Sequence, residues 1–271
     1  MQAQLSHFAL NGQTLPIEQF DDDLTNGQTS VYEVIKIINS RPVFLSQHMR
    51  RLGQSLARAG FDPSWATPVG PTIQQLLGQC PVARHNIRVA VVFKGDAPPR
   101  TVVYFIASSY PSAADYRHGV AVATTPAERA NPTAKVEQLE LRQRTNRMMI
   151  ERGLFEVLLV NGRGQITEGS RSNLFAVQGG RLITAPDEAV LGGITRNVVL
   201  SIAHRSGLPV ELRCPHIDEL PGMEAMFITG TSPMVLPVRQ CGDLQFNAQH
   251  PMVANLAQQY AQAEAADIGL A

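Results

Sequence analysis

The chain has 271 residues, enough for one large domain or two modest ones. Apolar residues make up 44% and charged residues 17%, which excludes general disorder and favours a sizeable core. The 23 basic and 23 acidic residues balance, so the chain lacks the basic excess of a general nucleic-acid binder. Only three lysines, Lys36, Lys94 and Lys135, can supply an amine for chemistry.

Apolar runs and cysteines exclude further classes of protein. No apolar run approaches the roughly 20 residues of a membrane span, and the N-terminus lacks the basic and apolar regions of a signal peptide. Cys80, Cys214 and Cys241 are odd in number and far apart, which predicts free thiols rather than disulfides or a cysteine metal site. We therefore expect a cytoplasmic protein with no bound metal and with neither a membrane nor a nucleic acid as partner.

Residues 1–107 are expected to form a smaller N-terminal α/β domain, a sheet with helices beside it. Runs of β-branched residues predict strands, and apolar residues at helical spacing predict helices. The strands are expected at 31–38, 43–45, 87–93 and 101–107, and the helices at 46–59, with Ser46 as its cap, and at 72–77.

Residues 108–115 are small and polar with one proline, which is typical of a linker. Residues 116–271 are expected to form a larger C-terminal domain that binds a cofactor. Strands are expected at 119–123, 155–160, 174–177, 181–184 and 224–228, and helices at 136–152, 196–206 and 252–266. The expected fold class is a two-domain α/β (α+β) protein.

Two glycines before a predicted helix form the first candidate site. Gly192 and Gly193 let the backbone come close to a ligand, and the first N–H groups of a helix have no partner within it. Together with the helix dipole, such a start favours an anion such as phosphate. The alternative is a plain glycine turn with Thr195 as an ordinary N-cap.

Three other positions can complete the same site. Glu168 follows a strand-like stretch and is either a solvated loop acid or a carboxylate that pairs with a protonated ligand nitrogen. Arg51 follows His48 by about one helical turn and is either a surface cation or an inward-facing one. Lys135, next to the midpoint of the chain, is the last of the three lysines. Phosphate donors, an inward arginine, a carboxylate and a lysine are together the components of a pyridoxal phosphate site.

Two motifs at a fixed spacing, Glu168–Phe175 and Leu191–Arg196, resemble those of class IV aminotransferases, the fold-type IV pyridoxal phosphate enzymes. Residues 31–36 with His48 and Arg51 are similar to the N-terminal signature, most of all that of the D-amino-acid enzymes. The resemblance runs from about Gln28 to Val238. It implies a homodimer of two-domain subunits with pyridoxal 5′-phosphate in the interdomain cleft.

The resemblance also implies a role for each matching residue. Lys135 is implied as the catalytic, Schiff-base lysine. The implied cofactor-binding residues are Arg51, Thr231 and the N–H groups of Ile194 and Thr195 at the phosphate, Leu191 on the ring face and Glu168 at the ring nitrogen. The implied substrate-binding residues are Tyr32, Arg100 and Ser232.

The position of the lysine has two interpretations. Family members carry Lys-x-x-Asn at the start of a helix. If Asn146 is that asparagine, Gln143 replaces the lysine and the protein binds the cofactor without turnover. Lys135 stands 18 residues before Gly153, as the family's catalytic lysine does, with Gln138 in place of the asparagine. This spacing assigns Lys135.

The activity implied is transamination between a small amino acid, of D-amino-acid or branched-chain type, and a 2-oxo acid. The alternative at the same site is aminodeoxychorismate lyase, in which the lysine's proton transfer ends in pyruvate elimination. The Gly-rich N-terminal segment of the branched-chain enzymes is missing, and Val102 stands where D-amino-acid enzymes carry a histidine. Substrate side chain, stereochemistry and oxo-acid partner therefore stay open at this point.

Overall fold

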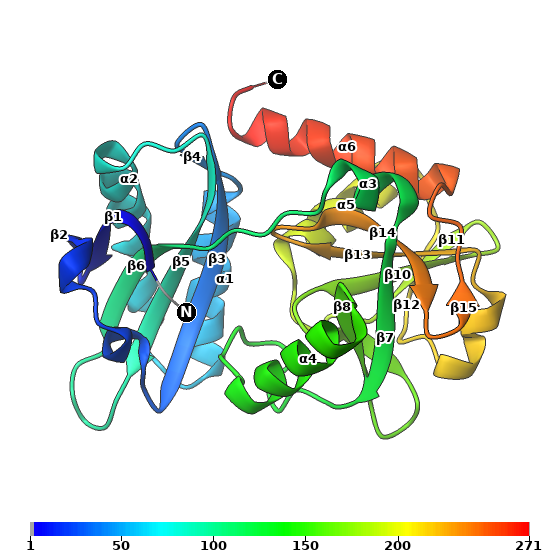
Figure 1. Ribbon diagram of the computed structural model, residues 1–271, viewed down its shortest axis with the longest axis horizontal. Helices are drawn as coiled ribbons and strands as arrows, with labels where there is room; N and C mark the ends of the chain where they lie inside the picture. The colour runs from blue at the N-terminus through cyan, green and yellow to red at the C-terminus, as the bar shows by residue number, and fades with distance from the viewer. Residues whose placement is uncertain (1–2, 271) are drawn as a thin grey trace. The chain divides into compact units, whose positions relative to one another are not determined.

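The computed structural model describes residues 3–270, which fall into two compact units (Figure 1). Unit 1 comprises Met1–Ser109, Ala134–Glu137 and Glu264–Ala271, and unit 2 comprises Tyr110–Thr133 and Gln138–Ala263. Two short segments that follow residue 109 in the chain thus belong to unit 1. The boundaries expected from the sequence did not include either of them, and Lys135 lies in the first.

Unit 1 is built on an antiparallel sheet with the strand order β2-β1-β6-β5-β3-β4. Its strands are β1 (Ala3–Leu10), β2 (Gln13–Pro16), β3 (Thr29–Ile38), β4 (Arg41–Pro42), β5 (Arg84–Phe93) and β6 (Arg100–Ile106). Its helices are α1 (Leu45–Arg58) and α2 (Val69–Gln79), with short 3-10 turns at Ile17–Gln19, Asp22–Thr25 and Pro63–Ala66. The expected strands at 31–38, 87–93 and 101–107 are confirmed; β1 and β2 were not expected.

The core of unit 1 lies between one face of this sheet and the two helices. Alternate residues of β3, β5 and β6 point to that face, and apolar residues one turn apart on α1 and α2 meet them. Each fully buried Leu or Ile contributes roughly 1.5–3 kcal/mol relative to an exposed one. The residues with no exposed surface include Ile35, Leu52, Leu56, Ile73, Leu76, Ile87, Val89 and Val103.

The start of α1 differs from the expectation. The strand expected at 43–45 is absent, since the hairpin partner of β3 is β4 and the helix already begins at Leu45. Its N-cap is Phe44 in the left-handed region (φ 52°), not Ser46. The Phe44 N–H donates to the carboxylate of Asp267. A residue distant in sequence thus supplies an acceptor at this helix start, which local capping patterns do not reveal.

Unit 2 is built on a mixed sheet with the order β12-β11-β10-β13-β14-β7-β8-β9, and β15 pairs with β14. The pairs β7–β8, β7–β14 and β11–β12 are parallel. The strands are β7 (Val120–Pro126), β8 (Glu156–Val160), β9 (Ile166–Gly169), β10 (Asn173–Gln178), β11 (Arg181–Thr184), β12 (Val210–Leu212), β13 (Ala225–Gly230), β14 (Met234–Cys241) and β15 (Leu244–Gln245).

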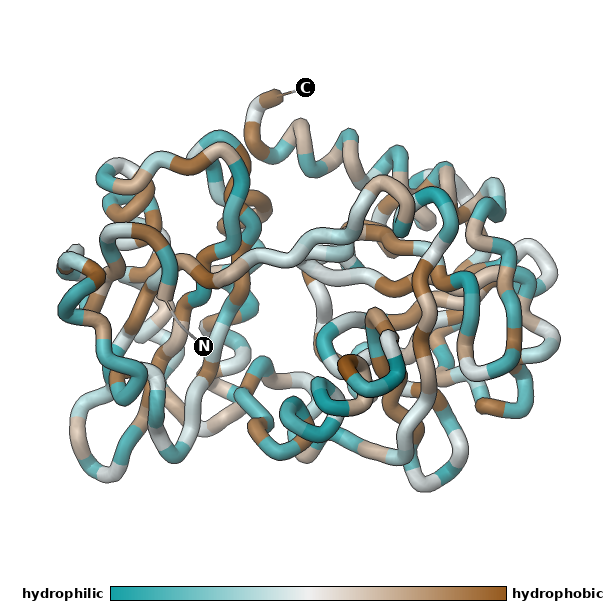
Figure 2. Tube along the Cα trace, in the orientation of Figure 1, coloured by the Kyte–Doolittle hydropathy of each residue, from teal (hydrophilic) through white to brown (hydrophobic). Residues whose placement is uncertain are grey.

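The helices of unit 2 are α3 (Ala113–His118), α4 (Leu139–Arg152), α5 (Ile194–Arg205) and α6 (Pro251–Asp267), whose last residues belong to unit 1, with a 3-10 turn at Ile217–Gly222. Residues 113–115 of the expected linker are helical, because Ser112 and Asp115 form a capping box. Much of α4 is hydrophilic (Figure 2), and it begins at Leu139 rather than at 136.

The interior of unit 2 contains an apolar cluster with residues from β8, β9, β10 and β13. Leu158, Ile166, Leu174 and Met226 pack in one cluster with almost no exposed surface. This packing anchors β9 and β10. The motif that begins with Glu168 runs from the end of β9 through a turn into β10.

No helix within residues 3–270 is both long and apolar enough to cross a membrane. The three cysteines are free thiols, as expected. Burial raises the pKa of the Cys241 thiol to about 11.

Candidate functional site

Lys135 belongs to a short extended segment that lies beside the edge of β3. The Tyr32 N–H donates to the Lys135 carbonyl (3.0 Å), and Val31 and Val136 form an antiparallel bridge. The Lys135 N–H donates to Ser55 Oγ of α1 (3.1 Å). The backbone on both sides of the lysine is therefore fixed. Its Nζ lies 4.7 Å from the centroid of the Tyr32 ring.

The two other lysines lie in different surroundings. Lys36 is buried and bonds both carboxylate oxygens of Glu264 at 2.9 and 2.8 Å. Burial lowers the pKa of its amine, and Glu264 opposes that shift. Lys94 is exposed and pairs with Asp23. Lys135 is thus the lysine whose amine lies next to an aromatic ring and a cluster of charged groups.

Arg88 of β5 belongs to that cluster, although the sequence analysis did not select it. Its guanidinium carbon lies 4.2 Å from the Tyr32 ring centroid, and Nη2 donates to Glu137 at 2.7 Å. Only 3% of the Arg88 side chain is exposed. Its Nε and Nη1 are buried and have no hydrogen-bond partner among the described residues. Buried donors without partners are costly, so this guanidinium suits an anionic ligand.

Arg51 faces inward, as one of the two sequence interpretations required. Its Nε and Nη2 donate to the two carboxylate oxygens of Glu33 at 2.7 and 2.6 Å, and Nδ1 of His48 lies 2.7 Å from the same carboxylate. Burial by itself raises the pKa of Glu33, but the charges and hydrogen bonds of Arg51 and His48 outweigh it and hold that pKa far below its usual range.

The pKa of the neighbouring imidazole, that of His48, is also shifted by its surroundings. Burial lowers the pKa of His48, Glu33 opposes the shift, and the charges of Arg51 and Lys135 add to it. Burial thus favours the neutral form of His48 and Glu33 favours the charged form, whereas Arg51 carries a permanent positive charge. The pairing with Glu33 fixes the orientation of the Arg51 guanidinium; its contact with phosphate stays a prediction.

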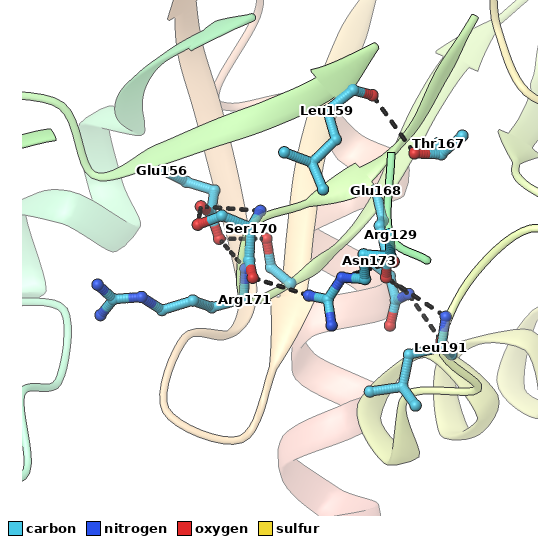
Figure 3. Close-up of polar contacts among 10 residues, drawn as sticks. Arg129, Glu156, Leu159, Thr167, Glu168, Ser170, Arg171, Asn173 and Leu191 are labelled. Carbon is cyan, nitrogen blue, oxygen red and sulfur yellow. Dashed lines mark hydrogen bonds and ion pairs between the residues drawn. The ribbon is translucent and has the colours of Figure 1, made fainter. Parts of the chain in front are cut away.

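Glu168 lies at the end of β9 in unit 2, and only 3% of its side chain is exposed (Figure 3). It is not the solvated loop acid that the sequence left open. Arg129 Nε lies 3.0 Å from its Oε1, and the Leu191 N–H and Asn173 Nδ2 each lie 3.4 Å from its Oε2. Asn173 also donates to the Leu191 carbonyl at 2.9 Å. A carboxylate and the chain segment of Leu191 are thus held together.

The start of α5 has the form expected of an anion-binding helix. Gly193 is the N-cap, and no side chain of the described residues caps it. Thr195 is therefore not the N-cap, and its hydroxyl lies 3.3 Å from that of Tyr260. A Cβ on Gly193 would lie 2.1 Å from Asn173 Oδ1, so any other residue at this position would displace the Asn173 amide. The first N–H groups, those of Ile194 and Thr195, have no partner within the helix.

The remaining predicted residues lie in loops or at a strand end. Thr231 and Ser232 form the turn between β13 and β14 and are half-buried. Arg100 begins β6 in unit 1, and its Nη2 donates to the carbonyls of Asp23 and Asn26 at 3.1 and 3.2 Å. Its contacts thus run to the 3-10 turn at 22–25 and the residue after it, rather than to Tyr32.

A family comparison decides what kind of site this is. The model of the amino-transferase class IV family matches residues 30–241. The chain belongs to this family. Class IV aminotransferases are pyridoxal phosphate enzymes, so the family and cofactor expected from the sequence are confirmed, and so is a PLP-dependent enzyme.

Relatives and solved structures agree with this class IV assignment. A probable branched-chain-amino-acid aminotransferase of Thermotoga maritima is 29% identical over 83% of this chain and 81% of its own. A D-alanine aminotransferase of Bacillus licheniformis is 29% identical over 77% of both. The Escherichia coli branched-chain amino acid aminotransferase structure has a TM-score of 0.86 at 21% identity and covers 97% of this chain and 96% of its own. The two-domain α/β fold is thereby confirmed.

The described residues of this class IV aminotransferase fit pyridoxal phosphate. The uncapped start of α5 can accept a phosphate, since its N–H groups and dipole favour an anion. The buried Glu168 can accept from a protonated ring nitrogen. Lys135 supplies an amine, and the backbone on both sides of this residue is fixed by hydrogen bonds. Gln143, the alternative to Lys135, lies on the exposed side of α4.

Four charged residues of these clusters were missed: Glu33, Arg88, Arg129 and Glu137. Glu33 lies inside the N-terminal signature, and its neighbours Tyr32 and Arg51 could have indicated it. Arg88 alternates with apolar residues along a strand, so a charge at a buried position was a possible signal. Arg129 and Glu137 had no local signal, because their partners are 39 and 49 residues away in the chain.

Proposed function

We propose that this class IV aminotransferase moves the amino group of a small aliphatic amino acid to a 2-oxo acid. The observation that carries the proposal is the cluster in unit 1. There the Lys135 amine lies over one aromatic ring together with the buried guanidinium of Arg88. An α-amino acid substrate requires an amine that can transfer its proton and a cation that can bind its carboxylate.

Each residue has a proposed part in this reaction. When bound, pyridoxal phosphate supplies the electron sink for the α-carbon. Lys135 takes the proton from the substrate α-carbon and returns it at C4′ of the cofactor. Glu168 accepts a hydrogen bond from the ring nitrogen, and Leu191 packs on the ring face. The phosphate is bound by Arg51, Ile194, Thr195 and Thr231, while Tyr32 and Ser232 contact the substrate side.

Arg88 is a better candidate than Arg100 for the substrate carboxylate. Arg88 has two buried donors without hydrogen-bond partners among the described residues, and a carboxylate can satisfy such a guanidinium with two parallel hydrogen bonds. Arg100 already donates to two backbone carbonyls of the loop at 23–26. The branched-chain relatives support the L-branched-chain type, with D-alanine as the competing donor.

An amino-donor screen tests the substrate class. Holoenzyme is incubated with 2-oxoglutarate and either L-leucine, L-valine or D-alanine, and the oxo acid formed from each donor is measured. Aminodeoxychorismate is offered separately without an acceptor, where release of pyruvate indicates the lyase. Turnover of branched-chain donors supports the proposal. Turnover of D-alanine alone refutes the branched-chain substrate, and pyruvate from aminodeoxychorismate alone refutes transamination.

Substitutions of the two arginines form a matched pair. We expect Arg88→Gln to raise the KM for the donor by about tenfold or more, the effect of losing a charge-assisted hydrogen bond. Arg100→Gln should leave KM within about twofold, because it lies outside the cluster. The reverse result would return the carboxylate site to Arg100.

Borohydride reduction of the holoenzyme followed by peptide mass mapping tests the lysine. Labelling of Lys135 supports its role. Labelling of Lys36 or Lys94 overturns it. A labelled protein without turnover of any donor would favour the alternative of a cofactor-binding protein that is not catalytic.

A further inference from the structure

Arg129 forms an ion pair with Glu168. It lies in the loop after β7, within unit 2, and 10% of its side chain is exposed. Its Nε lies 3.0 Å from Glu168 Oε1, and its Nη2 donates to the Ser170 carbonyl at 2.8 Å. Figure 3 shows the guanidinium between the carboxylate and the turn that follows it.

The contact between Arg129 and Glu168 acts mainly through charge. The Nε–H is not aligned on the carboxylate, so Nε has no hydrogen-bond partner among the described residues although the ion pair is short. The donors on the other oxygen, Leu191 N and Asn173 Nδ2, are distant at 3.4 Å. Burial favours the protonated form of a carboxylate, and a cation beside it favours the ionised form.

A second buried carboxylate, that of Glu156, orders the turn that Arg129 contacts. Glu156 accepts from the hydroxyls of Ser170 and Ser172 at 2.6 and 2.7 Å, and from the N–H of Arg171 at 3.1 Å. The turn is also tight, since a Cβ on Gly169 would lie 2.2 Å from Ser172 Oγ. The Ser170 carbonyl is therefore a rigid acceptor, and it holds the guanidinium against Glu168.

We propose that Arg129 is a positioning residue that keeps Glu168 ionised and aimed at the cofactor's ring nitrogen. This inference rests on the proposed contact of Glu168 with that nitrogen. An ionised Glu168 accepts a hydrogen bond and leaves the proton on the nitrogen, whereas a protonated Glu168 donates one to a neutral nitrogen. Arginine keeps its charge at every working pH, so its effect on the ionisation of Glu168 does not change with pH.

Binding of two ligands to the apoprotein tests the inference without measuring turnover. One ligand is pyridoxal phosphate, and the other is its 1-deaza analogue, in which a C–H group replaces the ring nitrogen. Wild type should prefer pyridoxal phosphate, because the analogue cannot donate to Glu168. In Arg129→Gln this preference should fall by about tenfold, the effect expected for a charge-assisted hydrogen bond, while affinity for the analogue stays nearly constant.

Four further variants make the test more specific. Arg129→Lys keeps the charge without the planar fork and should retain an intermediate preference. Adding Arg129→Gln to Glu168→Gln should change the preference no further, since the two residues act as one unit. Arg181→Gln, on the exposed hairpin of β10 and β11, is the matched control and should behave as wild type.

The possible outcomes are distinguishable. If Arg129→Gln weakens both ligands equally, Arg129 only supports the loop and the inference fails. The same holds if wild type prefers pyridoxal phosphate and Arg129→Gln keeps that preference in full. If wild type binds both ligands equally, the proposed role of Glu168 itself fails, and the inference with it.

Discussion

Replacing Glu33 by glutamine is expected to destabilise the protein strongly, because it leaves a buried guanidinium without its counter-charge. Glu33 has no exposed surface, and the two nitrogens of Arg51 lie 2.7 and 2.6 Å from its oxygens. Removing one partner of a buried ion pair typically costs about 3–5 kcal/mol. Because a glutamine oxygen can still accept one of the hydrogen bonds, we expect a loss near the lower limit, about 3 kcal/mol.

The stability difference between wild type and Glu33→Gln should depend on pH with a defined sign. The folded-state pKa of Glu33 lies far below its ordinary value of 4.5. A depressed carboxylate pKa stabilises the fold above the unfolded-state pKa, and this stabilisation is lost as pH falls toward the folded-state pKa. The difference should thus be complete at pH 7 and smaller at about pH 3.

Urea denaturation followed by circular dichroism at both pH values measures this difference. Lys94→Gln, which removes a cation from an exposed pair with Asp23, is the control and should leave stability almost unchanged. Combining Glu33→Gln with Arg51→Met removes both charges and should recover part of the loss. Equal stability of wild type and Glu33→Gln at pH 7, or an equal difference at both pH values, would refute the reasoning.

Three further predictions concern other parts of the chain. Gly193→Ala should push the Asn173 amide off the Leu191 carbonyl and lower stability by about 1–3 kcal/mol; an unchanged melting temperature would contradict the 2.1 Å approach. Gln138→Asn should give α4 the side-chain cap that it lacks and raise the free energy of unfolding by about 0.5–1 kcal/mol in urea denaturation; no gain would show that the cap does not form. Cys241, whose pKa burial raises to about 11, should stay unmodified by iodoacetamide at about pH 8 in the native protein, as checked by mass spectrometry.

Most strands and helices could be predicted from local sequence patterns. Runs such as 87–93 and 155–160 have few alternatives to a buried strand, because β-branched residues pack well there. The start of α1 could not be predicted, since Phe44 adopts a left-handed conformation and its N–H bonds Asp267, which is 223 residues away. Strands β1 and β2 were missed because their residues are partly exposed and carry a weak apolar alternation.

The sequence by itself determined the family, the cofactor and the candidate residues that lie within short motifs. The spacing of Lys135 from Gly153 and the motif around Glu168 are local features, so they can be recognised without knowledge of the three-dimensional structure. The tertiary structure decided which charges meet: Arg51 with Glu33, Arg88 with Glu137, and Arg129 with Glu168. The order of strands in a sheet brings such partners together, and the low polarity of the interior then makes their pairing strong, whereas local sequence patterns encode neither effect.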